Sequence, residues 1–414
     1  MYLSWITISM KPLSIYVHIP FCRAKCNYCD FLSFTFAPEA VQRDYVKALL
    51  LEIEIEAAAY RDYEVRTVFI GGGTPSLLSV EDIKAIISKL RKCYCFADDI
   101  EPEITIEVNP GTVTDDILCC YRELGINRLS FGVQSADDNE LKLLGRIHTF
   151  EEFLGGYHSA RKHGFNNINV DIIFSLPSQT LSSWTNTIEQ IVKLEPEHIS
   201  AYSLIIEPDT PFYDLYSVDA CKGSEIIDDE TDRDIYRFTK GFLNEYNYTR
   251  YEISNYAKNG YECMHNITYW RRGDYVGFGL GAASMINNTR WSNIGDLKSY
   301  IMIYLNEGGF ESAFLDKNYD ESKIGKQNQG TKIKLHALSL KEQIEEYLFL
   351  GLRLTDGVNL VQFKSTFNND LFYFYKDILN ELKENKLINI DNTVTLTDYG
   401  IDISNYVMSR FLFE

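Results

Sequence analysis

Three cysteines lie within eight positions near the start of the sequence, in the run FCRAKCNYCDF at residues 21–31. They are Cys22, Cys26 and Cys29, with the spacing C-x3-C-x2-C. A closed structural zinc site needs four ligands, and no fourth Cys or His follows at zinc-finger spacing. A disulfide would leave one thiol over, and ferredoxin-type sites use four cysteines per cluster. Three thiolates instead suit a [4Fe–4S] cube with one iron open to an exchangeable ligand, while zinc and plain buried thiols are the alternatives.

The remaining sequence favours a reducing compartment for these thiols. No segment reaches the ~18–20 consecutive apolar residues of a membrane span. The first ten residues, MYLSWITISM, lack a basic start and a cleavage site, so no signal peptide is expected, and either Met1 or Met10 can be the start. We therefore expect a cytoplasmic protein, where clustered thiols indicate metal binding or catalysis. Other cysteines are expected to be small buried apolar residues, namely Cys93, Cys95, Cys119, Cys120 and Cys221.

The charge balance argues against a nucleic-acid partner. Forty Lys and Arg face 59 Asp and Glu, which gives a formal net charge of −19. A nucleic-acid backbone favours clustered basic residues, so we expect no nucleic acid to bind. An acidic surface also does not favour anionic lipid, which leaves at most a peripheral membrane contact.

Strand and helix patterns alternate through the first half of the chain. This alternation predicts an α/β fold, with a parallel sheet that is either open and doubly wound or a partial barrel. Apolar β-rich runs predict strands at 13–21, 66–73, 103–110, 127–135, 167–177 and 198–208. Helical periodicity predicts helices at 38–60, 79–91, 114–124, 150–163 and 180–194.

The second half has a different pattern. Residues 211–300 are rich in aromatic residues, Asn and Gly, and residues 313–334 are polar and aperiodic, which predicts a linker or insertion. Helical patterns from 340 and around 360–385, followed by a hairpin at 386–400 and a last helix, predict a small winged-helix-like domain. Because the chain is acidic, we expect this domain to pack on the first half rather than to bind DNA.

Polar or glycine-rich residues follow several of the predicted strands. The second strand ends in Gly71-Gly72-Gly73-Thr74, the third at Glu107 and the fourth at Gln134, and the fifth carries Asp171. In parallel barrels, sites gather at the carboxyl ends of the strands. Glycines there let a backbone approach a ligand, and the other side chains suit ribose hydroxyls and an amino acid group.

These motifs together resemble a known family. The C-x3-C-x2-C run after the first strand resembles the radical S-adenosylmethionine (SAM) signature. YVHIPFCRAKCNYCDF, GGGTPS, EITIEVNP, RLSFGVQS, LGRIH and NVDIIFSLPSQT resemble the oxygen-independent coproporphyrinogen III dehydrogenase-like family, over about 13–300 and 340–410. The resemblance implies a partial (β/α)6 radical SAM barrel at 13–210, a barrel-extending region at 211–312 and a C-terminal, mainly α, winged-helix-like domain at 339–414. An N-terminal extension at 1–12 and a polar linker or insertion at 313–338 complete the expected division of the chain.

The resemblance also implies the cofactors and their ligands. Cys22, Cys26 and Cys29 would hold the cluster, and SAM would chelate the open iron. In the dehydrogenases part of the SAM set serves a second SAM, so one or two molecules are compatible with this chain. The implied SAM contacts are Tyr16, Tyr28, Gly72, Gly73, Thr74, Glu107, Gln134, Arg146 and Asp171.

Two departures separate this chain from the dehydrogenases of the family. They carry a fourth cysteine in a C-x-C, where this chain has Phe31, and a longer N-terminal arm, where only 21 residues precede Cys22 here. The haem-chaperone group of the family has the CDF run and an H-N-x-x-Y-W motif, present here at residues 265–270. The resemblance therefore implies a chaperone that binds haem and passes it to a haem-accepting protein. Porphyrinogen decarboxylation and radical chemistry on another substrate are the alternatives.

The resemblance implies that His265 helps to hold haem. Imidazole is a common axial ligand of haem iron, and Cys263 or Met264 offers a soft alternative. Arg271 and Arg272 are expected to pair with propionates. The alternative is a barrel-closing element in which His265 and Trp270 make buried hydrogen bonds. The aromatic residues expected to stack on the porphyrin are Tyr261, Tyr269, Trp270, Tyr275 and Phe278.

Overall fold

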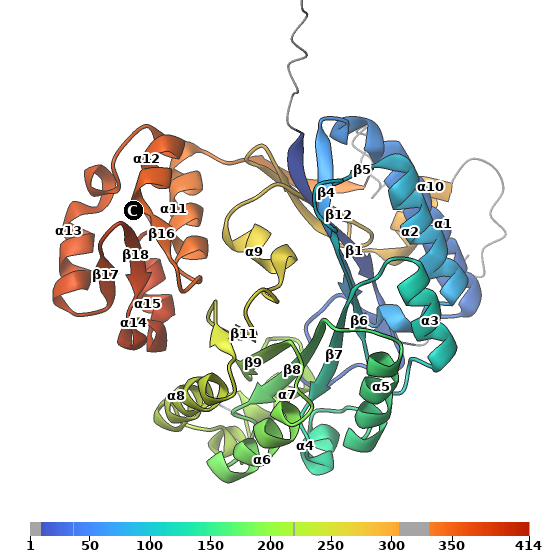
Figure 1. Ribbon diagram of the computed structural model, residues 1–414, viewed down its shortest axis with the longest axis horizontal. Coiled ribbons are helices and arrows are strands. Elements are labelled where there is room, and N and C mark those ends of the chain that lie inside the picture. Colours follow the sequence, from blue (N-terminus) through green and yellow to red (C-terminus); the bar gives the residue numbers. More distant parts are fainter. Residues whose placement is uncertain (1–9, 36, 218–219, 306–330, 414) are drawn as a thin grey trace, which may run out of the picture.

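A curved parallel sheet dominates the structure, a computed structural model that describes residues 10–35, 37–217, 220–305 and 331–413 (Figure 1). The main sheet has the order β10-β11-β9-β8-β7-β6-β4-β1-β12-β13-β14-β15. Six consecutive members of it, from β9 to β1, run parallel, and each overlaps one predicted strand. These six are β1 (Lys11–Ile19), β4 (Tyr63–Gly72), β6 (Glu103–Val108), β7 (Arg128–Gln134), β8 (Ile168–Phe174) and β9 (His198–Ser203).

Helices connect the parallel strands and cover the outer face of the sheet (Figure 1). Their starts follow the local sequence: Ser79 and Thr114 cap α2 and α3, and Thr149 with Glu152 forms a capping box on α5. Each predicted helix overlaps an observed one, so these predictions are confirmed. The helices of this half are α1 (Glu39–Glu56), α2 (Val80–Cys93), α3 (Asp115–Glu123), α4 (Asp138–Leu143), α5 (Phe150–Lys162), α6 (Leu181–Val192), α7 (Pro211–Tyr216) and α8 (Asp229–Glu245).

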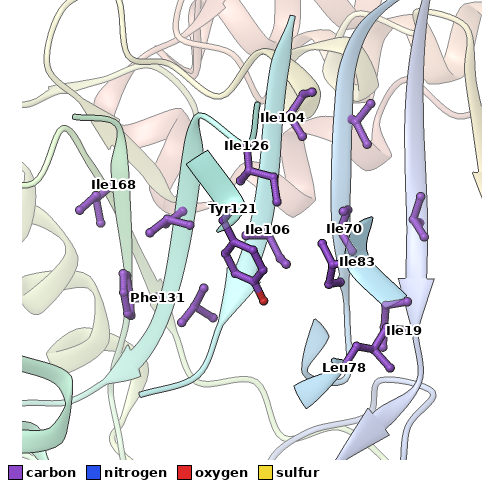
Figure 2. Close-up of a cluster of buried hydrophobic side chains, with 14 of the residues drawn as sticks. Ile19, Ile70, Leu78, Ile83, Ile104, Ile106, Tyr121, Ile126, Phe131 and Ile168 are labelled. Carbon is purple, nitrogen blue, oxygen red and sulfur yellow. The ribbon is translucent and has the colours of Figure 1, made fainter. Parts of the chain in front are cut away.

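The period of two along each strand divides the sheet into an apolar face and a polar face. On β7, Leu129, Phe131 and Val133 are fully buried in the main core, while Arg128 and Ser130 alternate with them. Figure 2 shows part of this core, with side chains of the central strands packed against those of the covering helices. Burial of each large apolar side chain contributes roughly 1.5–3 kcal/mol. The core thus holds the strands in register, and the opposite, polar face remains available for chemistry.

Shorter strands extend both ends of the parallel sheet. At one end β12 (Tyr275–Phe278) runs parallel to β1, and β13 (Ala283–Ile286), β14 (Thr289–Asn293) and β15 (Lys332–Ala337) follow antiparallel. At the other end β11 (Asn255–Ala257) and β10 (Thr249–Arg250) add to β9. The remaining short elements are β2 (Phe21–Cys22), β3 (Phe34–Thr35), β5 (Cys95–Phe96), α9 (Met264–Trp270) and α10 (Leu297–Leu305).

Strand β15 corrects the prediction of a linker up to residue 334. The run KIKLHA at 332–337 alternates polar and apolar residues, which is the pattern of a strand with one covered face. The aperiodic neighbours hid this alternation. Residues 313–330 lie outside the described residues, so their prediction stays a prediction.

The C-terminal residues form a small, mainly helical domain with its own core (Figure 1). Its three short strands pair in the order β16-β18-β17, so the predicted hairpin is confirmed, although three helices precede it instead of two. The elements are α11 (Leu340–Gly351), β16 (Val358–Asn359), α12 (Leu360–Phe367), α13 (Leu371–Glu384), β17 (Ile388–Ile390), β18 (Thr393–Leu396), α14 (Asp398–Asp402) and α15 (Ser404–Ser409).

The expectation that the scattered cysteines are buried is wrong in part. Cys95, Cys119 and Cys221 are exposed, and Cys93 and Cys120 are half-buried. Cys119 lies on the solvent side of the short helix α3, whose buried positions are Leu118 and Tyr121. Within the described ranges, no helix is both long and apolar enough to cross a membrane.

Candidate cofactor site

The carboxyl ends of the parallel strands surround a cavity of about 330 Å³, here called the mouth cavity. It brings together all three clustered cysteines and eight of the nine predicted SAM contacts. The predicted residues that line it are Cys22, Cys26, Cys29, Tyr28, Gly72, Gly73, Thr74, Glu107, Gln134, Arg146 and Asp171. Tyr16, the ninth, lies deeper in the barrel and lines a different cavity.

The cysteine loop is held in place by contacts from other elements. Asn27 anchors it, since its backbone N–H donates to Leu144 O at 2.9 Å and its side-chain amide to Leu143 O at 2.9 Å. Arg146 Nη1 donates to Cys26 Sγ at 3.4 Å, and Thr74 Oγ1 to Cys22 Sγ at 3.7 Å. A cation and a hydroxyl next to sulfur stabilise a thiolate, which is the form that binds metal.

The surroundings of Cys29 disfavour its thiolate form. Burial raises the pKa of Cys29 to about 11, and the neighbouring Cys26 and Cys22 add to the rise. A bound metal centre relieves this cost because the thiols lose their protons on coordination. In the described part of the chain, no three His, Cys, Asp or Glu side chains are close enough to hold a single metal ion. A cluster with one cysteine on each of three irons does not need such close convergence.

The glycine turn after β4 approaches the cysteine loop more closely than a side chain would allow. Gly73 N–H donates to Ile19 O at 2.8 Å, and a Cβ added at Gly73 would lie 2.7 Å from Phe21 O and 3.0 Å from Cys22 Sγ. Gly72 has a φ of +115°, a conformation that favours glycine. The bare backbone of the two glycines therefore lies close beside the thiol loop. This close approach is compatible with the expected cluster.

Two buried carboxyl groups lie on the wall of the mouth cavity. Glu107 Oε2 accepts from Gly72 N–H at 2.9 Å, and Asp171 accepts from Ser130 Oγ at 3.1 Å and Asn169 Nδ2 at 2.8 Å. Burial raises the pKa of Glu107 to about 8, with a further rise from Asp171, and burial also raises the pKa of Asp171. Such groups can bind the hydroxyl and ammonium groups expected of SAM.

Two further residues of the mouth cavity were missed in the sequence. Asn109 joins the glycine turn to the cysteine loop, since its Nδ2 donates to Thr74 Oγ1 at 2.9 Å and its Oδ1 accepts from Arg146 at 2.8 Å. Tyr202 OH donates to Gln134 Oε1 at 3.1 Å. The signal was available, because Asn109 follows Glu107 in EVNP and Tyr202 lies near the end of the sixth strand.

His265 lies at the start of α9, which sits on the inner side of the curved sheet (Figure 1). It is buried, with Nδ1 2.7 Å from Thr67 Oγ1 and Nε2 2.8 Å from Tyr269 OH. Burial lowers the pKa of His265 to about 3, so the ring is neutral at neutral pH. Glu103 caps the helix by accepting from Met264 N–H and His265 N–H, each at 3.0 Å. Both ring nitrogens of His265 are therefore engaged in this structure.

His265 does not line the mouth cavity. It lines a second cavity of about 460 Å³, the inner chamber, together with Tyr16, Arg128, Asn169, Asn266 and Tyr269 among others. The two cavities share wall residues, among them Phe31, whose ring is 59 % exposed.

Three of the expected porphyrin contacts line a third cavity of about 420 Å³, the aromatic slot. Its walls are Tyr16, Tyr269, Trp270, Tyr275, Ala283, Met285, Arg290 and Leu350. Tyr269 and Tyr275 meet edge to face at 4.6 Å between ring centroids. Tyr261 is not among the slot residues, and Phe278 is fully buried in the main core.

The polar partners expected for haem are otherwise engaged. Arg271 pairs with Asp356, and Arg272 Nε pairs with Glu346 at 3.2 Å. Cys263 is fully buried, and burial raises the pKa of its thiol to about 12. Met264 is 52 % exposed and lies outside the slot and the chamber.

Comparisons with known proteins agree with this geometry. Residues 16–191 match the family model of the Radical SAM superfamily, and residues 338–403 match that of the HemN C-terminal domain. The chain is also similar over 97 % of its length to the solved coproporphyrinogen III oxidase HemN of Escherichia coli, with a TM-score of 0.79, 24 % identity and 90 % of that chain covered. At this identity the likeness shows the fold, and it confirms the prediction of a radical SAM fold with a small C-terminal domain.

Relatives of higher identity cover two thirds or more of this chain, and two of them cover nearly all of it. The haem chaperone HemW of Bacillus subtilis is 36 % identical over 403 residues, which are 97 % of this chain and 99 % of that protein. HemW of Lactococcus lactis is 31 % identical over 98 % of both chains, and HemW of Escherichia coli is 41 % identical over 66 % of this chain and 70 % of its own length. From these likenesses, we conclude that the chain belongs to the radical SAM superfamily and, within it, to the family of the haem chaperone HemW.

Proposed function

We propose that this protein is a haem chaperone of a reducing cytoplasm, which binds haem and transfers it to an acceptor protein. The observation that carries the proposal is the likeness to HemW proteins over nearly the full length of the chain. Phe31 adds support, because it stands in the mouth cavity where the dehydrogenases are expected to carry a fourth cysteine.

We propose further that the mouth cavity holds a [4Fe–4S] cluster and SAM. Cys22, Cys26 and Cys29 would ligate the cluster, and the bound pair supplies one-electron chemistry. The remaining residues of the cavity position these groups: the Arg146 cation lies beside Cys26 Sγ, and the bare backbone of Gly72 and Gly73 leaves room beside the thiols. Polar contacts to SAM would come from the other predicted residues, Tyr16, Tyr28, Thr74, Glu107, Gln134 and Asp171.

Electron paramagnetic resonance of the anaerobically reconstituted and reduced protein tests the cluster. We expect a [4Fe–4S] signal that changes when SAM is added, and Cys29→Ser is expected to lose it. Exposed Cys119 provides the matched control, since Cys119→Ser should leave the signal unchanged. Tightly bound zinc in the purified protein, or a signal that does not respond to SAM, would contradict the proposal.

For haem we propose the aromatic slot with His265 as axial ligand. Tyr269 lines the slot, and its hydroxyl is hydrogen-bonded to His265 Nε2. A movement of Tyr269 therefore exposes the imidazole to the slot. The lowered pKa of His265 favours ligation, because a neutral ring has no proton to lose.

An anaerobic haem titration tests this assignment. We expect a Soret band, at least tenfold weaker binding in His265→Ala, and equal or tighter binding in Tyr269→Phe, because the phenylalanine frees Nε2 without removing the ring. His158→Ala is the matched control, since His158 is exposed on α5 and lines none of the three cavities. Equal haem affinity of wild type and His265→Ala would exclude His265 as the axial ligand. Consumption of coproporphyrinogen III with formation of stoichiometric 5′-deoxyadenosine would overturn the chaperone assignment.

A further inference from the structure

The mouth cavity and the inner chamber lie in series along the barrel. On β7, Gln134 and Gly132 line only the mouth cavity, Ser130 lines both, and Arg128 lines only the inner chamber. The neighbouring strands repeat this order: Ile173, Asp171 and Asn169 on β8, and Tyr202 and Ser200 on β9. Because inward side chains recur every second residue, successive positions on each strand reach successive depths. Arg128 is thus the deepest inward residue of β7.

Arg128 is a buried cation without a direct partner. Its side chain is 2 % exposed, and its Nε has no hydrogen-bond partner. Within the described residues, its guanidinium makes no hydrogen bond and no ion pair within 4 Å. In contrast, the buried Arg146 donates to Cys26, Asn109 and Gly132 O. An unpaired buried charge is costly, and proteins normally pair it.

The carboxyl groups that act on Arg128 are already engaged. Glu103 and Asp171 both act on it electrostatically, but Glu103 caps α9 and Asp171 accepts from Ser130 and Asn169. Glu107, further up the wall, accepts from Gly72 N–H. Arg128 therefore retains free donors next to the open volume of the chamber.

A second free donor lines the same volume. Asn266 follows His265 on α9, lines the inner chamber, is half-buried, and makes no side-chain hydrogen bond to any described residue. A guanidinium fork and an amide N–H together match the two oxygens of a carboxylate. The chamber holds about 460 Å³, which is ample for a small carboxylate.

We propose that the inner chamber is a binding site for an organic carboxylate, held by Arg128 and Asn266. The site is separate from the three cysteines, whereas His265, the haem ligand proposed above, lines the same chamber. Two sources share this chemistry. One is a free small monocarboxylate, and the other is a propionate arm of a porphyrin in the aromatic slot, since Tyr16, Tyr269 and Ala283 line both cavities.

Glu107 on the chamber wall does not oppose an anion at neutral pH. Burial raises the pKa of Glu107 to about 8, so its protonated form is favoured, and burial also raises the pKa of Asp171. A protonated carboxyl can donate a hydrogen bond to a bound carboxylate.

Isothermal titration calorimetry of the anaerobically reconstituted full chain tests the site. Sodium propionate, haem and haem dimethyl ester are titrated into wild type, Arg128→Gln and Asn266→Leu. Exposed Arg43, which pairs with Glu39 on α1, gives the matched control Arg43→Gln. Thermal melts establish that each variant is folded, and Arg128→Lys, which keeps the charge but not the fork, replaces Arg128→Gln if that variant does not fold.

We expect saturable propionate binding to wild type and Arg43→Gln, at least tenfold weaker binding to Arg128→Gln or Arg128→Lys, and weaker binding to Asn266→Leu. If haem affinity falls in parallel and the dimethyl ester is insensitive to Arg128, the propionate arm of a porphyrin is the occupant. If only propionate is affected, a free carboxylate is the occupant. No propionate binding to wild type, or equal binding to the Arg128 variants, overturns the site, and neither result depends on the haem-chaperone proposal.

Discussion

Gly73 sets how closely the turn after β4 approaches the cysteine loop. A Cβ at this position would meet backbone atoms of Phe21 at 2.7 and 2.9 Å, which a backbone cannot avoid cheaply, and Cys22 Sγ at 3.0 Å. We predict that Gly73→Ala displaces the loop and lowers the iron and sulfide content after reconstitution at least severalfold. Chemical analysis of iron and sulfide, with the absorbance of the cluster, measures this loss.

Gly155 is the matched control for that substitution. It lies within α5, and a Cβ there would meet nothing within 4 Å. Gly155→Ala is expected to leave cluster content unchanged and to stabilise the fold by up to about 1 kcal/mol, because alanine is the better helix former. Full cluster content in Gly73→Ala would mean that the close approach is not needed for assembly.

The residue types of the mouth cavity could be predicted from the sequence, but their depth could not. Cys26, Gly73, Glu107 and Asp171 come together as expected, because the carboxyl ends of parallel strands share one edge. Tyr16 was assigned to the same set yet lines the inner chamber, since a period of two gives the face of a strand and not the position along the barrel. One partner of His265, Thr67, comes from a distant segment, which a single sequence does not reveal.

At the scale of elements, a buried glutamate ties α1 to the end of the sheet. Glu52 accepts from Gly279 N–H at 2.8 Å, from Asn293 Nδ2 at 2.6 Å and from Tyr300 OH. These partners follow β12, lie on β14 and lie on α10. The carboxyl group of Glu52 therefore connects α1 to β14, to α10 and to the residues that follow β12.

Glu52 makes the stability of the protein depend on pH. Burial raises the pKa of Glu52 to about 7 from its ordinary value of 4.5. Between these two values the folded state holds a proton that the unfolded state has lost, so stability falls as pH rises and levels off above about 7. The contribution lost over this window is on the order of 3 kcal/mol. We predict that Glu52→Gln removes this part of the pH dependence, which urea unfolding from pH 5 to 8 measures.

Glu54, two residues away on the exposed face of α1, is the control. It pairs with Lys89 at the surface, so Glu54→Gln should keep the wild-type slope of stability against pH between 5 and 7. Identical slopes for wild type and Glu52→Gln would show that Glu52 is ionised in the folded state and that its neighbours compensate for burial.

The sequence did not distinguish Glu52 from the surface acids around it. It stands in LEIEIEAA, where three glutamates alternate with apolar residues and nothing in the run marks one of the three as buried. Its partners lie more than 200 positions away, so only the assembled fold identifies it as buried. Strand β15 was not predicted for a similar reason. The residues before it are aperiodic, and its pairing with β14 is seen only in the assembled fold.

At the scale of the whole molecule, two adjacent arginines that follow α9, Arg271 and Arg272, pair with acidic residues of the C-terminal domain in different surroundings. Arg272 is almost fully buried against Glu346 of α11, which also pairs with Arg290, whereas Arg271 meets Asp356 in solvent. We predict that Glu346→Gln lowers the free energy of unfolding by about 3–5 kcal/mol, because it leaves the buried guanidinium of Arg272 without a compensating charge. Thermal unfolding and limited proteolysis near residue 338 measure the loosening.

The exposed pair provides the comparison. Asp356→Asn should cost less than about 1 kcal/mol and leave the proteolysis pattern unchanged, since surface ion pairs are screened. Equal effects of the two substitutions would mean that the domain is held by its apolar contacts rather than by the buried cation.

The sheet order also fixes when the protein can finish folding during synthesis. Val17 of β1 pairs with Phe278 of β12, so one edge of the first strand has no partner until that distant segment leaves the ribosome. At ~5–20 residues per second this takes roughly 10 to 50 seconds, during which an apolar strand next to the thiol loop exposes its hydrogen-bonding groups. A nascent chain stopped before residue 275 should therefore associate with other chains or recruit chaperones, whereas one that extends past residue 293 can close this edge.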